Sequence, residues 1–452
     1  MEKTMSTDYG FSKVAIQLPE ILLPNEQIDL AKWSVVACDQ YTSQLDYWNK
    51  VKENTQQQPS SLNIIFPEVY LEDSDGEQRL QNINQTMRDY LSDGILKPIA
   101  KPGFVLVDRK TSQAPSRKGL VVSIDLEQYD FNKGSSSLIR ATEGTIVDRL
   151  PPRIKVRKDA EIELPHIMVL IDDPDKTVIE PLFNEQLETL YDFELMEQSG
   201  HLKGYAIDQP DLLQKISDNL SKLADKQTFA DKYGAEDKDI LLYAMGDGNH
   251  SLATAKAIWE TLKSESSDLD SIMQNPARYA LVELVNIHDA GLQFEPIHRV
   301  LFDVNPQHLL DALSNYYYKN ECLVTACESE QQMIDLSSQA QTETNHVVPF
   351  VSPEGYGFIT IDQPSFTLEI ASIEDFFNLY LEANQVKVDF IHGDDVVNEL
   401  GKQKGNMGFF FPPISKNSLF KTIIFDGALP RKTFSMGEAD EKRFYLEARK
   451  IK

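Results

Sequence analysis

The side chains with the clearest chemical potential in this sequence lie in one glycine-containing turn. Residues 244–251 read Ala-Met-Gly-Asp-Gly-Asn-His-Ser, between a short apolar run and a stretch of helical periodicity. A strand that ends on glycines before a helix presents backbone N–H groups at the positive end of the helix dipole. We therefore predict an anion site, suited to phosphate, formed by Gly246, Asp247, Gly248, Asn249, His250 and Ser251.

The same turn has a simpler structural interpretation. Asp247 or Asn249 can cap the helix that follows, as such residues do at many helix starts. His250 argues for more than capping, because a protonated imidazole is unfavourable at the positive end of a helix. A neutral His250 beside a bound anion suits this position, so we favour a functional site.

A second segment, residues 139–153, brings arginines, acids and threonines together. Arg140 is suited to bidentate recognition of phosphate or carboxylate. Glu143 is suited to act as a general base or a magnesium ligand, and Gly144 lets the backbone approach a ligand closely. A solvated loop with weak surface ion pairs is the alternative.

Three other segments carry basic or nucleophilic side chains. His298 and Arg299 are adjacent, and a lone histidine is either a structural or a catalytic group. Lys432 follows a proline near the end of the chain, where it either reaches a phosphate or lies in a surface turn. Cys38 would need a histidine partner to act as a nucleophile, and the sequence places none beside it.

The charge balance narrows the range of partners. The 452 residues include 44 Lys and Arg but 71 Asp and Glu, which gives a net charge of −27. A protein this acidic has no general electrostatic footprint for nucleic acid and is repelled by anionic membranes. We expect a small-molecule substrate and a homodimer, and neither nucleic acid nor a membrane as partner. An anionic substrate would need a local basic pocket.

The cysteines and the N-terminus indicate a cytoplasmic protein. The three cysteines are an odd number without zinc-ligand spacing, which is typical of reduced thiols. The N-terminus lacks the apolar core of a signal peptide, and no run approaches the ~20 apolar residues that span a bilayer.

Alternating helix and strand patterns predict an α+β (mixed α/β) chain of more than one domain. We expect residues 1–302 to form a main domain that carries the Asp-Gly-Asn-His turn. Residues 303–390 are expected to form a small α+β unit. Residues 391–452 are expected to be a C-terminal segment that returns to the main domain.

Some individual elements follow directly from the hydrophobic pattern. It predicts a helix over 210–223 and a strand over 279–286. It also predicts strands over 33–38 and over 162–171.

Five motifs together resemble the bacterial and archaeal family known as domain of unknown function 1015, over nearly the whole chain. They are Ala-Cys-Asp-Gln-Tyr-Thr-Ser at 37–43, Ile-Arg-Ala-Thr-Glu-Gly-Thr at 139–145, Gly-Asp-Gly-Asn-His at 246–250, His-Arg at 298–299 and Pro-Arg-Lys-Thr at 430–433. The family more often has Asp-Gly-His-His-Arg at the central turn, whereas here Ser251 stands in place of the arginine. If that arginine binds phosphate in relatives, Arg140 or Lys432 is expected to replace it.

The central turn is also similar to the Asp-Gly-His-His-Arg segment of the ParB and sulfiredoxin-like superfamily, over the turn and its helix alone. Members of that superfamily bind nucleotides at this turn, and some phosphorylate free serine. The resemblance implies a ParB/sulfiredoxin-like core and a nucleotide site, with ATP or ADP and Mg²⁺ as cofactors.

The leading hypothesis is a kinase-like phosphotransferase or nucleotide hydrolase that acts on a small hydroxylated metabolite such as free serine. The predicted catalytic residues are Glu143, Asp247, His250 and His298. The predicted phosphate- or nucleotide-binding residues are Arg140, Thr142, Thr145, Gly246, Gly248, Asn249, Ser251, Arg299 and Lys432. No metal ligand is assigned.

Two alternatives stay open. A non-enzymatic, ParB-like regulator that responds to a nucleotide would need a DNA-binding element with a basic face, which the net charge opposes. A metal-dependent hydrolase would use His250, His298 and Asp247, but these residues lack a recognised ligand spacing.

Overall fold

The computed structural model describes residues 8–56, 58–145, 148, 150–317 and 322–452. By its internal contacts the chain divides into two units. The first unit contains the residues up to Gln293 together with Gly437–Lys452, and the second unit is Phe294–Met436. The mixed α/β class expected from the sequence is confirmed.

These limits differ from the expected ones. The first unit ends at Gln293, before the expected limit at residue 302, and residues 391–436 belong to the second unit. The part of the chain that returns to the first unit therefore begins at Gly437. The second unit is, in sequence, an insertion between two parts of the first.

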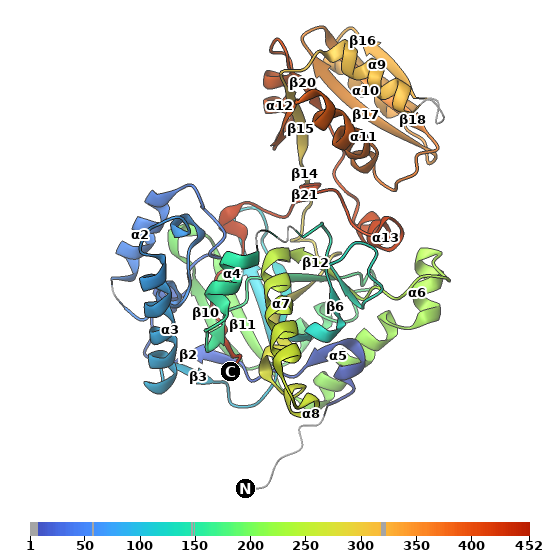
Figure 1. Ribbon diagram of the computed structural model, residues 1–452. Helices are drawn as coiled ribbons and strands as arrows, with labels where there is room; N and C mark the ends of the chain where they lie inside the picture. Colours follow the sequence, from blue (N-terminus) through green and yellow to red (C-terminus); the bar gives the residue numbers. More distant parts are fainter. Residues whose placement is uncertain (1–7, 57, 146–147, 149, 318–321) are drawn as a thin grey trace. The chain divides into compact units, whose positions relative to one another are not determined.

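A ten-stranded mixed sheet organises the first unit, in the order β10-β11-β4-β5-β13-β9-β12-β7-β6 with β1 beside β5 (Figure 1). These strands are β1 (Ile16–Gln17), β4 (Phe104–Lys110), β5 (Arg117–Asp125), β6 (Tyr129–Asp130), β7 (Ile139–Arg140), β9 (Met168–Ile171), β10 (Thr189–Glu194), β11 (His201–Ile207), β12 (Tyr243–Asp247) and β13 (Tyr279–Asn286). Two short pairs complete the unit: β2 (Leu22–Pro24) with β3 (Leu96–Pro98), and β8 (Ile162–Glu163) with β22 (Arg449–Lys450).

The helices of the first unit are α1 (Leu30–Trp33), α2 (Leu45–Thr55), α3 (Gly76–Ser92), α4 (Leu150–Arg157), α5 (Pro210–Leu223), α6 (Lys226–Tyr233), α7 (Asn249–Glu265) and α8 (Leu269–Ile272). The α5 helix begins with proline, whose fixed φ suits a first helical position, and it buries Leu213, Ile216 and Leu220 on one face. The α7 helix packs against α4, as Figure 1 also shows.

The central strands are apolar on both faces because the sheet separates two hydrophobic cores. In β5, Leu120 and Val122 belong to one core, whereas Val121 belongs to the other. In β13, Val282 and Leu281 divide in the same way. This burial on both sides explains the near-continuous apolar runs in these strands.

A cluster of buried charges fixes the C-terminal segment in the first unit. The Arg443 guanidinium donates to the carboxylates of Glu283 on β13 and of Glu447, and all three residues are at most 7% exposed. The carboxylate of Glu447 also accepts a hydrogen bond from the Tyr191 hydroxyl. A Cβ at Gly119 would lie 2.3 Å from Glu283 Oε1, so this glycine leaves room for the buried carboxylate.

The second unit has its own six-stranded antiparallel sheet, in the order β16-β18-β17-β20-β15-β19. Its strands are β15 (His298–Phe302), β16 (Leu323–Cys327), β17 (Asn345–Ser352), β18 (Gly355–Asp362), β19 (Lys387–Ile391) and β20 (Met407–Phe409), and β14 (Glu295–Pro296) pairs with β21 (Phe434–Ser435). Its helices are α9 (Pro306–Tyr316), α10 (Glu330–Ala340), α11 (Glu369–Asn384), α12 (Asp394–Gly401) and α13 (Lys416–Asp426).

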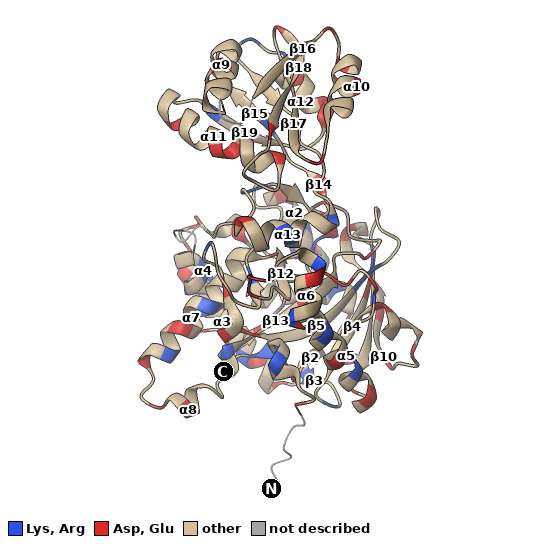
Figure 2. Ribbon diagram, turned by 90° about the vertical axis from the view of Figure 1, so that its right-hand side faces the viewer, with Lys and Arg blue, Asp and Glu red and all other residues tan. Residues whose placement is uncertain are grey.

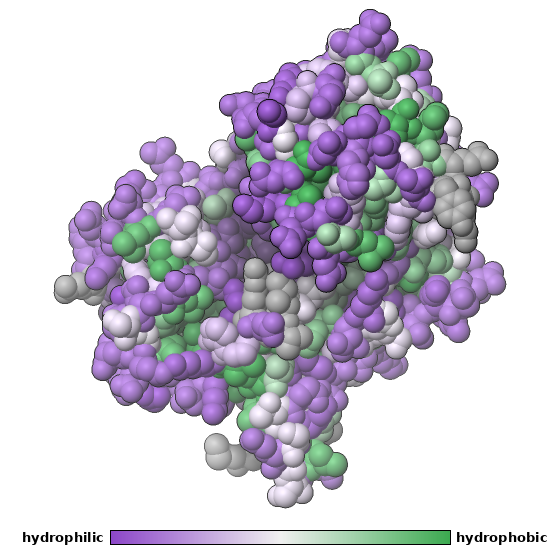
Figure 3. Space-filling model, turned by 45° about the horizontal axis from the view of Figure 1, so that its top comes forward, coloured by the Kyte–Doolittle hydropathy of each residue, from purple (hydrophilic) through white to green (hydrophobic). Residues whose placement is uncertain are grey.

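The surface is mixed in character. Basic and acidic residues are interspersed on the elements that Figure 2 presents. Hydrophilic residues predominate on the face shown in Figure 3, and the apolar ones form small separate patches. No helix in the described part of the chain is long and apolar enough to cross a membrane.

We predict that replacing Arg443 with leucine destabilises the first unit strongly. Arg443→Leu leaves the carboxylates of Glu283 and Glu447 buried without their guanidinium, a loss that costs about 3–5 kcal/mol. Urea unfolding at pH 7 measures this cost. Arg79→Leu is the control, because Arg79 pairs with Asp75 at the surface and its loss changes stability by about 0.5 kcal/mol or less. Equal stability of the two variants would contradict the prediction.

Candidate functional site

The central turn adopts the expected strand–turn–helix geometry. Strand β12 ends at Asp247, Gly248 has a φ of 81°, and α7 begins at Asn249. A Cβ at Gly248 would lie 3.1 Å from Ile167 Cα, so both the backbone angle and the close neighbour favour glycine. The turn thus joins the end of β12 directly to the N-terminal end of a 17-residue helix, which carries a partial positive charge.

A polar cavity of about 180 Å³ lies at this helix start. Four separate parts of the chain line it: the central turn, the segment around Glu143, Asp39, and Arg153 on α4. Its lining residues are Asp39, Glu143, Gly144, Arg153, Asp247, Gly248, Asn249, His250 and Ser251. The structure therefore brings the two segments that the sequence analysis ranked highest to one place.

Asp247 is held by one contact from the C-terminal segment and one from the backbone of the turn. Its Oδ2 lies 3.0 Å from Lys442 Nζ, and its Oδ1 accepts a hydrogen bond of 2.8 Å from the Gly248 N–H. Burial by itself would raise the pKa of the Asp247 carboxyl, but the Lys442 ammonium and the Gly248 N–H hold that pKa below its ordinary value. Asp247 is therefore an ionised group at neutral pH, and Lys442 is a second cation beside the cavity.

Asn249 connects the central turn to the 139–145 segment. Its Nδ2 lies 3.5 Å from Thr142 Oγ1, while its buried Oδ1 has no hydrogen-bond partner among the described residues. A buried amide oxygen without a partner is costly in a protein interior. An incoming hydroxyl, water or metal ion could satisfy it, so this atom marks the cavity as a binding position.

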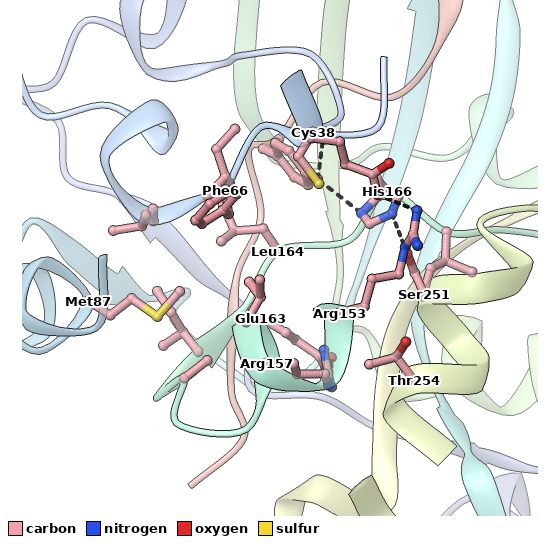
Figure 4. Close-up of a pocket in the computed structure, with 18 of the residues that line it drawn as sticks. Cys38, Phe66, Met87, Arg153, Arg157, Glu163, Leu164, His166, Ser251 and Thr254 are labelled. Carbon is pink, nitrogen blue, oxygen red and sulfur yellow. Dashed lines mark hydrogen bonds and ion pairs between the residues drawn. The ribbon is translucent and has the colours of Figure 1, made fainter. Parts of the chain in front are cut away.

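A chain of hydrogen bonds connects the first turn of α7 to residue 38 (Figure 4). Ser251 Oγ lies 2.8 Å from His166 Nε2, and His166 Nδ1 lies 3.0 Å from the Tyr445 hydroxyl, which accepts from the Cys38 N–H at 3.1 Å. Both ring nitrogens of His166 are thus engaged. The chain links α7, the segment before β9, the C-terminal segment and residue 38.

Cys38 is not an activated nucleophile. Burial, with the nearby Asp39 carboxylate, raises the pKa of its thiol to about 12. A thiol with this pKa is protonated at neutral pH and reacts poorly. Its place beside the His166 chain is structural.

Arg140 does not line the cavity. Its Nε donates to Ser137 O at 2.8 Å and its Nη2 to Asp239 O at 2.9 Å and Ile240 O at 3.2 Å. This guanidinium fixes the start of the 139–145 segment by binding backbone carbonyls. Burial lowers the pKa of Arg140, although Asp239 opposes the shift.

Other expected site residues are also placed apart from the cavity lining. Thr142 does not line the cavity but contacts Asn249, which does, and Gly246 lies within β12. The hydroxyl of Thr145 is buried and has no hydrogen-bond partner among the described residues. These three residues shape the backbone around the cavity.

The remaining expected residues belong to the second unit. His298 Nδ1 accepts from the Phe411 N–H at 3.1 Å, and its Nε2 lies 2.9 Å from Asp394 Oδ1. Burial lowers the pKa of His298, although Asp394 opposes the shift. These contacts describe a buried histidine that fastens β15 to neighbouring segments.

Arg299 and Lys432 are neighbours within the second unit. Arg299 is fully buried and donates to Glu374 at 2.6 Å, to Arg431 O at 2.9 Å and to Lys432 O at 3.1 Å. The Lys432 ammonium lies 4.7 Å from the centre of the Phe390 ring. Arg299 therefore holds the segment that carries Lys432.

Several groups in or next to the cavity were not predicted as site residues. Arg153 and Asp39 lie in segments that it singled out, so their charge and position were available signals. Lys442 and Tyr445 gave none, because no motif distinguishes the last residues of the chain. His166 lies in an apolar segment, where no neighbouring polar residue marks it as part of a site.

Among the described residues, no group of three or more His, Cys, Asp or Glu side chains is placed to hold a metal ion. A protein-only metal centre of the kind that a metal-dependent hydrolase would need is therefore absent from the described part of the chain. His250 and His298, which that alternative would combine, lie in different units.

A known protein family matches most of this sequence. The sequence profile described as "Protein of unknown function (DUF1015)" matches residues 22–383. The chain belongs to this family. No curated protein is similar enough to count as a match.

Several solved structures are similar in outline. A mutant of a free serine kinase in complex with AMP shares 9% identity at a TM-score of 0.39, covering 76% of this chain and 95% of its own. A conserved hypothetical protein from Pyrococcus furiosus shares 10% identity at a TM-score of 0.35, covering 74% and 95%. SbnI from Staphylococcus aureus, truncated at its C-terminus, shares 8% identity at 0.34, covering 70% and 82%. The ParB/sulfiredoxin-like core stays a prediction.

We predict that Lys442→Met destabilises the protein in a pH-dependent way. A carboxyl with a lowered folded pKa adds stability above its ordinary pKa of 3.8, and this stability is lost as the pH falls through the folded value. In the variant the Asp247 carboxylate loses its cation, which costs about 1 kcal/mol at pH 7 for this partly exposed pair.

The difference between wild type and Lys442→Met should shrink as the pH falls from 7 through 3.8, because the Asp247 carboxyl protonates at a higher pH in the variant, which lacks the ammonium, than in the wild type. Urea unfolding at several pH values measures it. Lys442→Arg keeps the charge and is the control. A difference that is constant over this pH range would show that the ion pair is not its source.

Proposed function

We propose that the first unit binds the phosphate groups of a nucleotide at the start of α7 and transfers a phosphoryl group to a small hydroxylated metabolite, of which free serine is one example. The observation that carries this proposal is the polar cavity at the helix start, where a glycine turn, an arginine and several carboxylates meet. Phosphoryl transfer depends mostly on positioning and charge stabilisation, which such a site provides.

The cations of the cavity would hold the phosphates against the acidic background of the chain. The N-terminal end of α7 supplies N–H groups and a partial positive charge. Arg153, whose guanidinium also pairs with Glu68, lines the same cavity and offers a planar group for phosphate oxygens. Lys442 lies within reach of Asp247, at the edge of this group. Arg153 and Lys442 thus take the role that the sequence analysis gave to Arg140 and Lys432.

We assign activation of the acceptor hydroxyl to Glu143, whose carboxylate lines the cavity. In the proposed step the hydroxyl oxygen bonds to the terminal phosphorus, the bond from that phosphorus to the bridging oxygen breaks, and Glu143 takes the hydroxyl proton. The products are the phosphorylated metabolite and the nucleotide shortened by one phosphate, which is a diphosphate from a triphosphate donor and a monophosphate from a diphosphate donor. A carboxylate beside the phosphate site suits this role of general base.

Magnesium would enter with the nucleotide. Mg²⁺ is usually held by one or two carboxylates together with phosphate oxygens and waters. Asp39 and Glu143 line the cavity and offer carboxylate oxygens of this kind, and Asn249 Oδ1, which has no hydrogen-bond partner within the described parts of the chain, is a further oxygen ligand. The ion would neutralise charge on the phosphates during transfer.

We predict that ATP with Mg²⁺ raises the melting temperature of the wild type and that His250→Ala weakens this effect. His250 lies in the first turn of α7 and lines the cavity, so its loss removes part of the phosphate contact. The expected loss of affinity is about tenfold to a hundredfold, which corresponds to roughly 1.4–2.8 kcal/mol. Isothermal titration calorimetry with ATP, ADP and pyrophosphate measures it.

His201→Ala is the matched control, because His201 lies on β11 and pairs with Asp192 away from the cavity. It should bind nucleotides as the wild type does. If no nucleotide binds the wild type, or if the two variants bind equally well, the site is wrongly assigned.

We predict a different effect for Glu143→Gln, because it keeps the shape of the side chain but removes the base. Nucleotide affinity should change little, while phosphoryl transfer falls by about 10²–10⁴-fold. Formation of phosphorylated product from a panel of hydroxylated metabolites, serine included, measures the transfer. Nucleotide binding without turnover in the wild type would instead favour a nucleotide-responsive regulator.

A further inference from the structure

The first unit has a second, mostly apolar cavity of about 150 Å³, which Figure 4 shows. The segment after η2 (Ser61–Ile64), helices α3 and α4, the chain around β8, and β13 form its walls. The apolar side chains that matter most are Ile65, Phe66, Met87, Val156, Leu164 and Leu281. No step of the proposed phosphoryl transfer uses this cavity.

The two cavities adjoin, because they share lining residues. Arg153 on α4 and Ser251 on α7 line both of them. Cys38 lines the apolar cavity and the next residue, Asp39, lines the polar one. A ligand with a polar and an apolar end can therefore occupy both cavities at once.

The charged residues of the apolar cavity are already compensated by protein partners. Glu163 is paired with Arg157 at 2.5 Å and with Arg449 at 2.6 Å. Glu68 accepts from Arg153, and burial raises the pKa of Glu68, although Arg153 opposes the shift. The start of α7, with its N–H groups and partial positive charge, lines the polar cavity, so a phosphate is stabilised more strongly there than in the apolar cavity.

The lining of this cavity suits a planar ring better than a phosphate group, because most of it is apolar. Ligand sites typically combine apolar walls, which bury most of the ligand, with a few polar groups that fix its orientation. Phe66 also offers an aromatic ring, on which a planar group can stack. The lining of the two cavities therefore favours one orientation of a ligand with two different ends, with its ring in the apolar cavity and its anionic groups in the polar one.

We propose that the apolar cavity holds the base of a nucleoside di- or triphosphate, with its phosphates directed to the start of α7. The base is the apolar end of the ligand class that the proposed function requires, and this inference rests on that function. The base would lie between Phe66, Leu164 and the α4 side chains, and the sugar would pass Arg153 and Ser251. The acceptor metabolite then approaches from the polar side, where Glu143 lies.

The test compares ATP with inorganic tripolyphosphate, which carries the phosphates but no base. Calorimetric titration of the full chain with each probe, at fixed Mg²⁺ and ionic strength, gives two affinities. The wild type should bind ATP at least about tenfold more tightly than tripolyphosphate, because burial of the base contributes favourably.

Leu164→Trp fills the apolar cavity and should remove this preference. ATP affinity should fall to the level of tripolyphosphate, while tripolyphosphate affinity stays within about twofold of the wild type. Leu187→Trp is the matched control, since Leu187 is half-buried and packs against the other core of the first unit. It should keep the full preference for ATP. Ala160→Phe fills the cavity from another wall and gives the same readout if Leu164→Trp does not fold.

The possible results separate this inference from the proposed function. Equal affinity of the wild type for the two probes, or a preference for ATP that survives both filling variants, would overturn the inference and leave the phosphate site standing. Failure of the wild type to bind either probe would overturn the proposed function and the inference together.

Discussion

The first unit depends on the buried ion pairs that Arg443 makes with Glu283 and Glu447. Three charged side chains in a protein interior are expensive to desolvate, and they are tolerated only when each is paired in good geometry. The central sheet provides one partner through β13, and the C-terminal segment provides the other two residues. The pairs therefore fix where residues 437–452 lie, which hydrophobic packing alone would specify less strictly.

The candidate site inherits its geometry from this constraint. Lys442 and Tyr445 flank the buried Arg443, so fixing that residue places one beside Asp247 and the other beside His166. The backbone of the same segment bonds to the N-terminal region, from the Ala37 N–H to Arg443 O at 2.9 Å and from the Tyr445 N–H to Val35 O at 2.9 Å. The N-terminal region and the C-terminal segment thus support the central turn together. In sequence, the whole second unit lies between the central turn and the C-terminal segment.

Elements with a complete local signal could be predicted from the sequence. The helix expected over 210–223 is α5 and the strand expected over 279–286 is β13, because periodicity and end signals agree in both. The strand expected over 33–38 is wrong, since Trp33 ends α1 and Val36 forms a single bridge with Phe444. Those apolar residues are buried by the C-terminal segment, a partner that local sequence does not reveal.

The strand expected over 162–171 is also wrong in part. The chain forms β8 at Ile162–Glu163 and β9 at Met168–Ile171, with Pro165 between them. Proline removes a ladder donor and interrupts a central strand, and this signal outweighed the continuous apolar run. The interruption places His166 where it can reach both Ser251 and Tyr445.

The site itself was predictable where its residues share a motif, and not where they meet only in the fold. The central turn and Glu143 line one cavity, as their composition suggested. Arg140 has the right chemistry for phosphate, yet its guanidinium is directed to the carbonyls of Asp239 and Ile240. Tertiary structure determines whether an arginine side chain binds a ligand or backbone carbonyls. The residue type alone therefore could not predict the role of Arg140.

The cations at the cavity already have acidic partners, and this has a consequence for how an anion binds. Lys442 is paired with Asp247 and Arg153 with Glu68, so neither charge is left uncompensated in a protein of net charge −27. An entering phosphate would compete with a carboxylate for each cation, and it would have to offer more oxygens in better geometry to win. Such pairs hold the cations in position before the ligand arrives, which lowers the entropic cost of binding. The carboxylates released in the exchange would then lie next to the phosphate, where they can accept a proton or share a magnesium ion with it.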